Sequence, residues 1–124
     1  DDWQTTLVTP NQFRSAWQRI ERQAAEMRRD VSQMPRCLYY NCHVNEDREI
    51  ALAESKEYLD AYYTTDFERE QLEIWVAMGD PAECIAAIDR YIDAGANIIT
   101  LRFTARNQAE QLRRFIRDVY PAFQ

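Results

Sequence analysis

The chain has 124 residues, the size of one ordinary domain. Hydrophobic residues make up 46% and charged residues 29%, a balance that supports a packed core and argues against extensive disorder. The formal charge of -6 would repel a phosphate backbone, and no apolar run approaches the roughly 18 residues that span a bilayer. We therefore expect neither nucleic acid nor a membrane as a partner.

The three cysteines are Cys37, Cys42 and Cys84, an odd number at irregular spacing. They match neither a disulfide framework nor a zinc pattern, so we interpret them as reduced core residues of a cytoplasmic protein. The sequence starts at Asp1 with no methionine and no secretory signal, which suggests a processed or truncated product.

The first half of the chain predicts a helix and then a buried strand. Thr9 and Gln12 can form a capping box at the start of a helix over 10–30. Its apolar positions recur at steps of three and four, as in an amphipathic helix: Phe13, Trp17, Ile20, Ala24 and Met27. The stretch 37–44 is rich in aromatic and small apolar residues, which favours a buried strand. A short strand over 6–8 is a further option.

Two helical segments come next. Asn45 can cap a helix that runs to about Tyr63, with acidic residues in its first turn as the helix dipole favours. A shorter amphipathic segment follows, and its apolar positions are Phe67, Leu72, Trp75 and Val76. Both segments are expected to pack on the sheet through their apolar faces.

Both glycines of the chain bracket one helix-to-strand unit. Gly79 precedes a capping Asp80, with Pro81 at the first helical position. Gly95 stands where a helix commonly ends in a left-handed residue, which glycine adopts without a steric penalty. The strand predicted over 97–103 is nearly continuous in apolar residues, which is typical of a strand covered on both faces of a parallel sheet. A last helix ends at about residue 120.

Strands that alternate with helices predict an α/β fold of right-handed βαβ units. Two or three parallel strands cannot cover both of their edges, and a closed barrel needs about eight strands in roughly 200 or more residues. We therefore expect either a piece of a larger fold or a chain that covers its edges with another copy of itself.

Three stretches carry a resemblance to a known family: "LYYNCHVNEDREIALAESKEYLDAYY", "WVAMGDPAECIAAIDRYIDAGANIITLRF" and "NQAEQLRRFIRDVYP". They resemble the carboxy-terminal part of the luciferase-like monooxygenases, the bacterial-luciferase superfamily of flavin- or deazaflavin-dependent oxidoreductases. The resemblance covers essentially all of residues 1–124 and corresponds to the last third of that family's (β/α)₈ TIM barrel. Asp2 departs from the aspartate-glycine-tryptophan that commonly opens this region.

The resemblance implies a partial barrel formed by the last two to three βα units, as a single carboxy-terminal segment. It also implies FMN or a deazaflavin as the cofactor of the parent enzyme, bound at the carboxyl ends of the barrel strands. Many of the contacts to that cofactor come from the earlier two-thirds of the family's barrel. We therefore expect this chain alone to bind no cofactor and to be inactive.

Two polar residues stand near strand ends. His43 is the only histidine, and it can act as an acid or base or simply be a hydrogen-bonded residue at a strand end. Arg102 interrupts the apolar run over 98–103. It can pair with an anionic group of cofactor or substrate, or form an internal ion pair with Asp or Glu on a flanking helix.

The other candidates have competing structural interpretations. Gly79 precedes a helix amino end that can attract phosphate, but Asp80 repels anions, and plain capping is the alternative. An aromatic pocket for a flat ring or an aliphatic substrate, as opposed to core packing, would use Trp3, Tyr39, Tyr40 and Trp75. Cys42 has no lysine or second histidine near it in sequence to activate it as a nucleophile. We expect no metal site, because clustered ligands are absent from the sequence.

Three hypotheses follow. The first is a segment of a luciferase-like monooxygenase, inactive alone. The second is a stand-alone, non-catalytic module that forms a homodimer through its exposed sheet edge. The third, a small independent enzyme, has the least support because these residues assemble no convergent catalytic set.

Overall fold

The structure is a computed structural model, and it describes residues 2–124. Asp1, which opens the Asp1-Asp2-Trp3 tract, lies outside the described residues. Strands and helices alternate as the sequence predicts, in the order β1 (Trp3–Thr6), α1 (Pro10–Glu26), β2 (Arg36–Val44), α2 (Arg48–Tyr63), α3 (Arg69–Trp75), β3 (Val76–Gly79), α4 (Pro81–Asp93), β4 (Ile98–Phe103), α5 (Gln108–Asp118) and a final 3₁₀ turn, η1 (Tyr120–Phe123).

The described strands form one parallel sheet with β2 at its centre. Strand β4 pairs with residues 37–42 of β2 along one edge. Strands β1 and β3 pair with residues 36–39 and 41–44 of β2, so they share the opposite edge in succession. The prediction of an α/β fold with parallel strands is confirmed.

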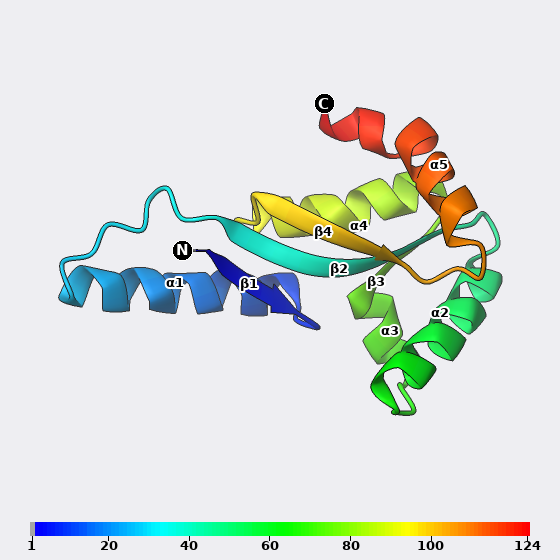
Figure 1. Cartoon of the computed structure of the whole chain (residues 1–124), viewed down its shortest axis with the longest axis horizontal. Helices are drawn as coiled ribbons and strands as arrows, with labels where there is room; N and C mark the ends of the chain where they lie inside the picture. Colours follow the sequence, from blue (N-terminus) through cyan, green and yellow to red (C-terminus); the bar gives the residue numbers. More distant parts are fainter. Residues whose placement is uncertain (1) are drawn as a thin grey trace.

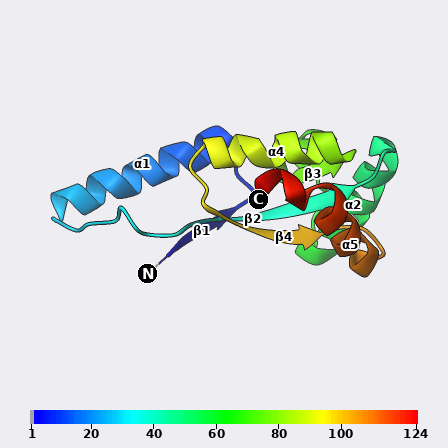
Figure 2. The same ribbon diagram turned by 90° about the horizontal axis from the view of Figure 1, so that it is seen from above.

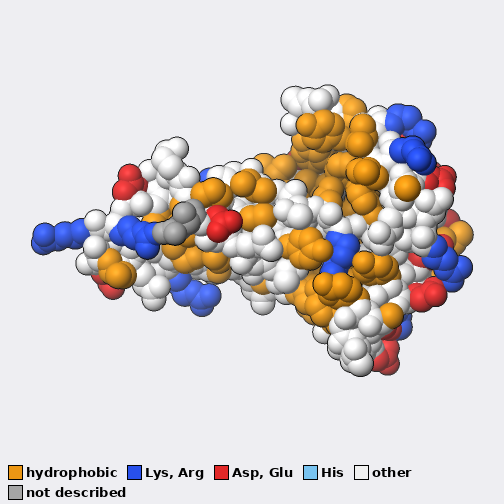
Figure 3. Space-filling model, viewed as in Figure 1, with side chains coloured by type: hydrophobic (Ala, Val, Ile, Leu, Met, Phe, Trp, Pro, Cys, Tyr) orange, Lys and Arg blue, Asp and Glu red, His pale blue; other side chains and the backbone are white. Residues whose placement is uncertain are grey.

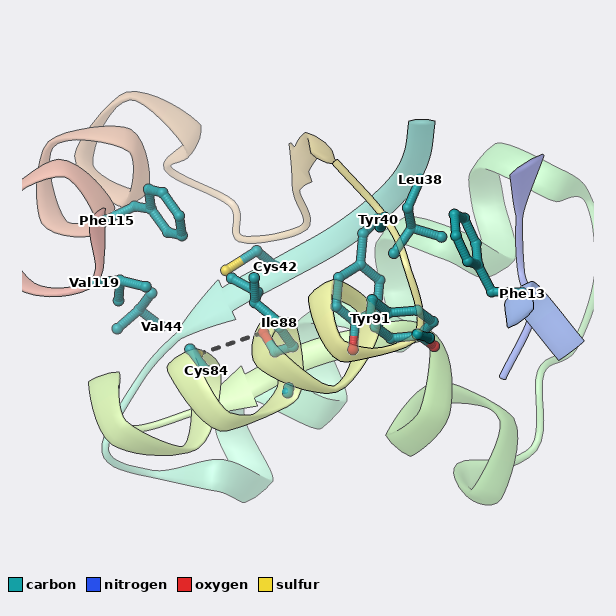
Figure 4. Packing of buried hydrophobic residues seen from close by; sticks show 14 residues of the cluster. Phe13, Leu38, Tyr40, Cys42, Val44, Cys84, Ile88, Tyr91, Phe115 and Val119 are labelled. Atoms are coloured by element: carbon teal, nitrogen blue, oxygen red, sulfur yellow. Dashed lines mark hydrogen bonds between the residues drawn. The ribbon is translucent and has the colours of Figure 1, made fainter. Parts of the chain in front are cut away.

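Helices α1 and α4 cover one face of the sheet (Figures 1 and 2). Alternate residues of β2 point into this layer: Leu38, Tyr40, Cys42 and Val44. They meet Ile88 and Tyr91 of α4, and Phe115 and Val119 at the α5 end of the same cluster (Figure 4). This alternation is the period of two that a strand imposes on its side chains.

A second cluster lies at the carboxyl end of β2, where α2 and α3 pack against β3. Its buried members are Ala51, Leu59, Phe67, Leu72, Val76 and Met78. These two helices are the lower right part of Figure 1, and they project from the carboxyl end of the sheet. No described helix is long and apolar enough to cross a membrane.

Three local predictions were wrong. The short strand lies at Trp3–Thr6 rather than over 6–8, because Leu7 takes a positive φ of 53° and ends it. Helix α2 begins two residues later than predicted, because Asp47 and not Asn45 accepts the free amides of the first turn. Strand β3 replaces the end of the expected helical segment, since Val76 pairs with Asn41 of β2.

Two further expectations about burial also fail. Met27 is 76% exposed, because α1 ends at Glu26 and its apolar stripe stops there. Strand β4 is not covered on both faces: Ile98 is 46% exposed, and Thr100 on the same face is exposed as well. The helices α1 and α4 lie on the opposite face of the sheet, and α2 reaches only the end of β4 near Arg102.

The predicted roles of the two glycines and the placement of the three cysteines in the core are confirmed. Gly79 and Gly95 have φ values of +119° and +109°, in the region that L side chains rarely adopt. Asp80 and Glu83 form a reciprocal capping box at the start of α4. Cys37, Cys42 and Cys84 are all buried and free.

Candidate functional site

The second face of β2 carries the polar residues of the strand. Asn41 and His43 alternate with the core residues of β2, and both are 1% exposed. Asn41 stands opposite Arg102 of β4 in the register, so their side chains emerge side by side near the carboxyl ends of the two strands. Helix α2 closes over them.

Arg102 is 8% exposed, and its guanidinium is held at two of its nitrogens. Its Nε donates to Oδ1 of Asn41 at 2.9 Å, and its Nη2 donates to the hydroxyl of Tyr63 at 3.1 Å. Asn41 is fixed in turn, because its Nδ2 donates to the carbonyl of Trp75 at 3.0 Å. The remaining nitrogen, Nη1, is buried and has no hydrogen-bond partner.

Four tyrosine rings surround this guanidinium, and we call them the tyrosine cage. The distances from the guanidinium carbon to the ring centres are 5.0, 5.8, 4.3 and 5.4 Å for Tyr39, Tyr58, Tyr62 and Tyr63. Cations are attracted to such ring faces, most strongly when both are shielded from water.

The predicted ion pair of Arg102 with a helix carboxylate is wrong. No Asp or Glu among residues 2–124 forms a salt bridge with Arg102, and an amide oxygen, a phenol and aromatic rings take that place. Burial acts to lower the pKa of Arg102, but the Tyr63 hydroxyl and the neighbouring phenols outweigh it and raise the pKa overall. The side chain is therefore a permanent buried cation.

His43 lies in a separate polar cluster one step further along β2. Its Nε2 is 3.6 Å from Oε2 of Glu54, and its Nδ1 is 3.5 Å from Oγ of Ser55. Ser55 also bonds Thr104 at 2.7 Å, so the cluster joins β2, α2 and the end of β4. Burial lowers the pKa of His43, Glu54 opposes this shift and Arg114 adds to it. His43 and Ser55 are both buried, which suits a bridge between elements better than an exposed acid or base.

The start of α4 uses its own side chains for capping. The amide of Glu83 donates to Asp80, and the amide of Asp80 donates to the Glu83 carboxylate, each at 2.9 Å. Pro81 has no amide hydrogen. The segment that follows Gly79 therefore caps α4, and two of the amide donors that a phosphate would need are already used.

The aromatic candidates do not come together. Trp3 packs on Phe13, with ring centres 4.8 Å apart, and Tyr40 packs on Tyr91 at the same distance, both in the layer next to α1 and α4. Only Tyr39 lies on the face of Arg102. Trp75 contacts the ring of Phe67 in the second cluster. Trp3, Tyr40 and Trp75 therefore serve the core.

Sequence reasoning missed the residues that complete the Arg102 environment. Tyr58, Tyr62 and Tyr63 fall in the helix predicted to run to about Tyr63, and Asn41 falls in the strand predicted over 37–44, but the sequence assigned none of them a functional role. One signal was available: Tyr58 and Tyr62 are four residues apart, so they share a helix face, and their rings stack at 6.3 Å. Nothing in the sequence told which strand residue this face would meet.

A long apolar groove lies on the other side of β4. Two adjoining pockets of about 560 and 410 Å³ share Ile99, Leu101, Phe115 and Tyr120. Figure 3 shows hydrophobic side chains gathered here, beside β4 and over α5. Four apolar residues that line the groove are between 43% and 54% exposed: Ile92 of α4, Leu112 and Ile116 of α5, and Tyr120 of η1. We call this surface the β4 groove.

The described residues fit a flavin or deazaflavin only in part. The free Nη1 of Arg102 suits a phosphate or carboxylate of such a cofactor, because guanidinium groups pair with oxyanions. A slot for the flat ring system is absent from the tyrosine cage, because the rings already close on the guanidinium. This chain therefore fits an anionic part of the cofactor and not its ring.

No family model and no curated protein matches the sequence. Two solved structures are similar in fold. An F420-dependent secondary alcohol dehydrogenase in complex with an F420-acetone adduct matches all of this chain at a TM-score of 0.84 and 17% identity. A coenzyme F420-dependent tetrahydromethanopterin reductase from Methanopyrus kandleri matches 94% of it at a TM-score of 0.69 and 15% identity.

The chain spans 43% of the length of each of these two structures. At such low identities the likeness establishes the fold and not the activity. The predicted fold, part of a (β/α)₈ barrel, is thus confirmed, and this chain corresponds to less than half of each of these two structures.

Proposed function

We propose that this chain forms the carboxy-terminal part of a luciferase-like oxidoreductase that uses a flavin or deazaflavin. The remaining strands of the barrel would pair with β4, and the remaining helices would fill the β4 groove. The match of the whole chain to 43% of an F420-dependent dehydrogenase supports this assignment.

The observation that carries the proposal is the open state of β4. Among residues 2–124, β4 pairs only with β2, so the backbone groups along its other edge have no strand partner. An unpaired parallel strand with an apolar groove beside it is a site for another strand and helix, because buried parallel sheets are covered on both faces. A further βα unit satisfies both requirements together.

In such an enzyme the flavin or deazaflavin would supply hydride or oxygen chemistry. Residues of this chain would contribute one wall at the carboxyl ends of the strands, where barrel enzymes bind their ligands. Arg102 would hold an anionic group there, with Asn41 and Tyr63 fixing its orientation. Since the ring site is lacking, we propose that the isolated chain is inactive.

Titration of the 124-residue chain with FMN and with F420, followed by absorbance and fluorescence, tests this assignment. We expect no stoichiometric binding with the spectral change of an enclosed ring, and no turnover of the reduced cofactor. Tight stoichiometric binding with turnover would show a complete active site within this chain and would contradict the proposal.

A second candidate rests on the same open edge. A stand-alone, non-catalytic module could cover β4 with β4 of another copy and form a homodimer. The two candidates differ in what happens at micromolar concentration, because only the second requires a defined dimer. Sedimentation equilibrium of the unmodified chain measures this difference, and a defined dimer would favour the second candidate.

A further inference from the structure

We propose that Arg102 and the tyrosine cage form an anion-binding site of this chain, in which a phosphate or carboxylate group takes the free Nη1 when the Tyr62 ring moves aside. The site is built entirely from described residues of β2, α2 and β4. It does not depend on the proposed oxidoreductase function, and it can be tested separately from it.

The first argument is the incomplete hydrogen bonding of a fixed cation. A guanidinium has five donor hydrogens in a rigid plane. Asn41 takes the hydrogen on Nε and Tyr63 takes one on Nη2, which leaves both hydrogens of Nη1 without an acceptor. Because two of its nitrogens are held, the guanidinium is fixed in orientation, and Nη1 remains to donate to an oxyanion.

The second argument is the absence of a counter-ion. The chain has 21 acidic residues, yet Arg102 forms no salt bridge with any Asp or Glu among residues 2–124. Other arginines in the same region are paired, as Arg106 is with Glu57 at 2.7 Å. A buried cation without a carboxylate partner is unfavourable by itself. Nη1 of Arg102 is therefore suited to pair with an anion from outside the chain.

The third argument concerns access. Tyr62 is the ring closest to the guanidinium, at 4.3 Å, and it is also 60% exposed. It lies one residue before the end of α2, where Thr64 takes a left-handed conformation. Rotation of this side chain into solvent would remove the ring nearest to the guanidinium without disturbing a buried residue. The other three tyrosines of the cage are more enclosed, so Tyr62 acts as the cover of the site.

The fourth argument is a pocket on the outer side of the cover. A cavity of about 450 Å³ is lined by Tyr58, Tyr62 and Thr104, among others. The carboxylates in its wall are already engaged: Glu57 pairs with Arg106, and Glu54 accepts the Arg106 amide at 3.2 Å. Movement of Tyr62 would join this cavity to Arg102, so that an anion could reach the guanidinium through the cavity.

The experiment is an NMR titration of the ¹⁵N-labelled 124-residue chain with sodium phosphate and with sodium acetate, at an ionic strength held constant with sodium chloride. The Nε–H signal of Arg102 reports binding at the guanidinium. We expect saturable shifts of that signal with at least one of the two oxyanions. The tighter of the two identifies whether a tetrahedral or a planar oxyanion fits.

Three variants decide the interpretation. Tyr62→Ala removes an exposed ring that has to move, so it should tighten binding at least threefold. Arg102→Met should weaken binding more than tenfold, while Arg106→Met, which removes the neighbouring exposed arginine, should change it less than twofold.

If Arg102→Met fails to fold, the Tyr62→Ala and Arg106→Met results still decide the question. Absence of saturable binding in both the unmodified chain and Tyr62→Ala would overturn the proposal. So would an affinity that follows Arg106, or one that Tyr62→Ala leaves unchanged.

Discussion

Of the two glycines, Gly79 carries the stricter steric demand. Its φ is +119°, and a Cβ added there would lie 1.9 Å from Oε2 of Glu83. That carboxylate oxygen accepts the amide of Asp80, so the same atom that would clash also caps α4. A side chain at position 79 would therefore strain the backbone and also displace the Glu83 carboxylate from the amide of Asp80.

We expect Gly79→Ala to lower the free energy of unfolding by about 2–4 kcal/mol, as a sum of backbone strain and cap loss. Gly95→Ala is the matched control, because Gly95 has a φ of +109° but nothing within 4 Å of an added Cβ. It should lower the free energy of unfolding by only about 1–2 kcal/mol. Urea unfolding of both variants measures the difference, and equal losses would contradict the clash with Glu83.

His43 makes stability depend on pH. Burial lowers the pKa of His43 below the ordinary value of 6.5. Below about pH 6.5 the unfolded chain takes up a proton that the folded chain refuses until a lower pH. The free energy of unfolding should therefore be highest above pH 6.5 and should fall as the pH drops toward the pKa of folded His43, by at most about 1.4 kcal/mol per pH unit.

His43→Gln should remove this slope, and His43 is the only histidine that could produce it. The measurement is the free energy of unfolding from urea titrations at pH 5.5, 6.5 and 7.5 for both proteins. Parallel curves would show that His43 is protonated as easily in the folded as in the unfolded chain. The carboxylates titrate in both proteins, so the comparison cancels them.

Among the elements, α5 is joined to the end of β2 by the amide side chain of Gln111, in addition to the packing of Phe115 and Val119 in the core. Gln111 is 8% exposed, and it bonds both backbone groups of Val44: Oε1 accepts the amide at 2.9 Å, and Nε2 donates to the carbonyl at 2.8 Å. Val44 is the last residue of β2, where the ladder with β4 has already ended. Gln111 therefore takes the place of a strand partner.

Gln111→Ala should lower the free energy of unfolding by about 1–3 kcal/mol, because it leaves the buried amide of Val44 unpaired and its carbonyl with only a long contact of 3.5 Å from Nη1 of Arg114. Gln108→Ala on the exposed side of the same helix is the control, and it should change stability by less than about 0.5 kcal/mol. Thermal unfolding followed by circular dichroism compares the two. Similar losses would mean that Val44 finds water or another partner.

The elements differ in how far the sequence could predict them. The boundaries of α4 follow from local chemistry, since Asp80, Glu83 and Gly95 act within one turn of the positions they control. Strand β3 could not be predicted, because Val76–Gly79 is four residues long and extended only through pairing with Asn41–Val44. The tyrosine cage has the same limit, since its residues come from β2 and α2 and meet Arg102 of β4 only in the tertiary fold.

At the scale of the whole molecule, β4 is the open boundary. Ile98 is 46% exposed at its start, and the β4 groove lies along the face that carries Ile99 and Leu101. An open apolar edge of this kind favours association with further chain, from the same or another molecule. The open edge of β4 should therefore determine whether the chain self-associates in solution.

We expect the chain to self-associate at micromolar concentration, and Ile98→Lys to weaken this association at least tenfold, because a lysine on a strand edge opposes pairing. Ile50→Lys on α2 is the control, since Ile50 is also 46% exposed but lies away from β4. Sedimentation equilibrium measures both. A folded monomer at these concentrations, or equal effects of the two lysines, would contradict a role for the edge.

The central position of β2 has a consequence for the order in which the chain folds. Every strand pairing in the described sheet includes β2, and two of its three partners lie 32 or more residues further along the sequence, since β2 ends at Val44 and β3 begins at Val76. During synthesis, β2 therefore leaves the ribosome before β3 and β4, and the backbone groups that pair with these two strands stay exposed to solvent until both have been made. Distant partners of this kind slow folding and prolong exposure to chaperones and proteases.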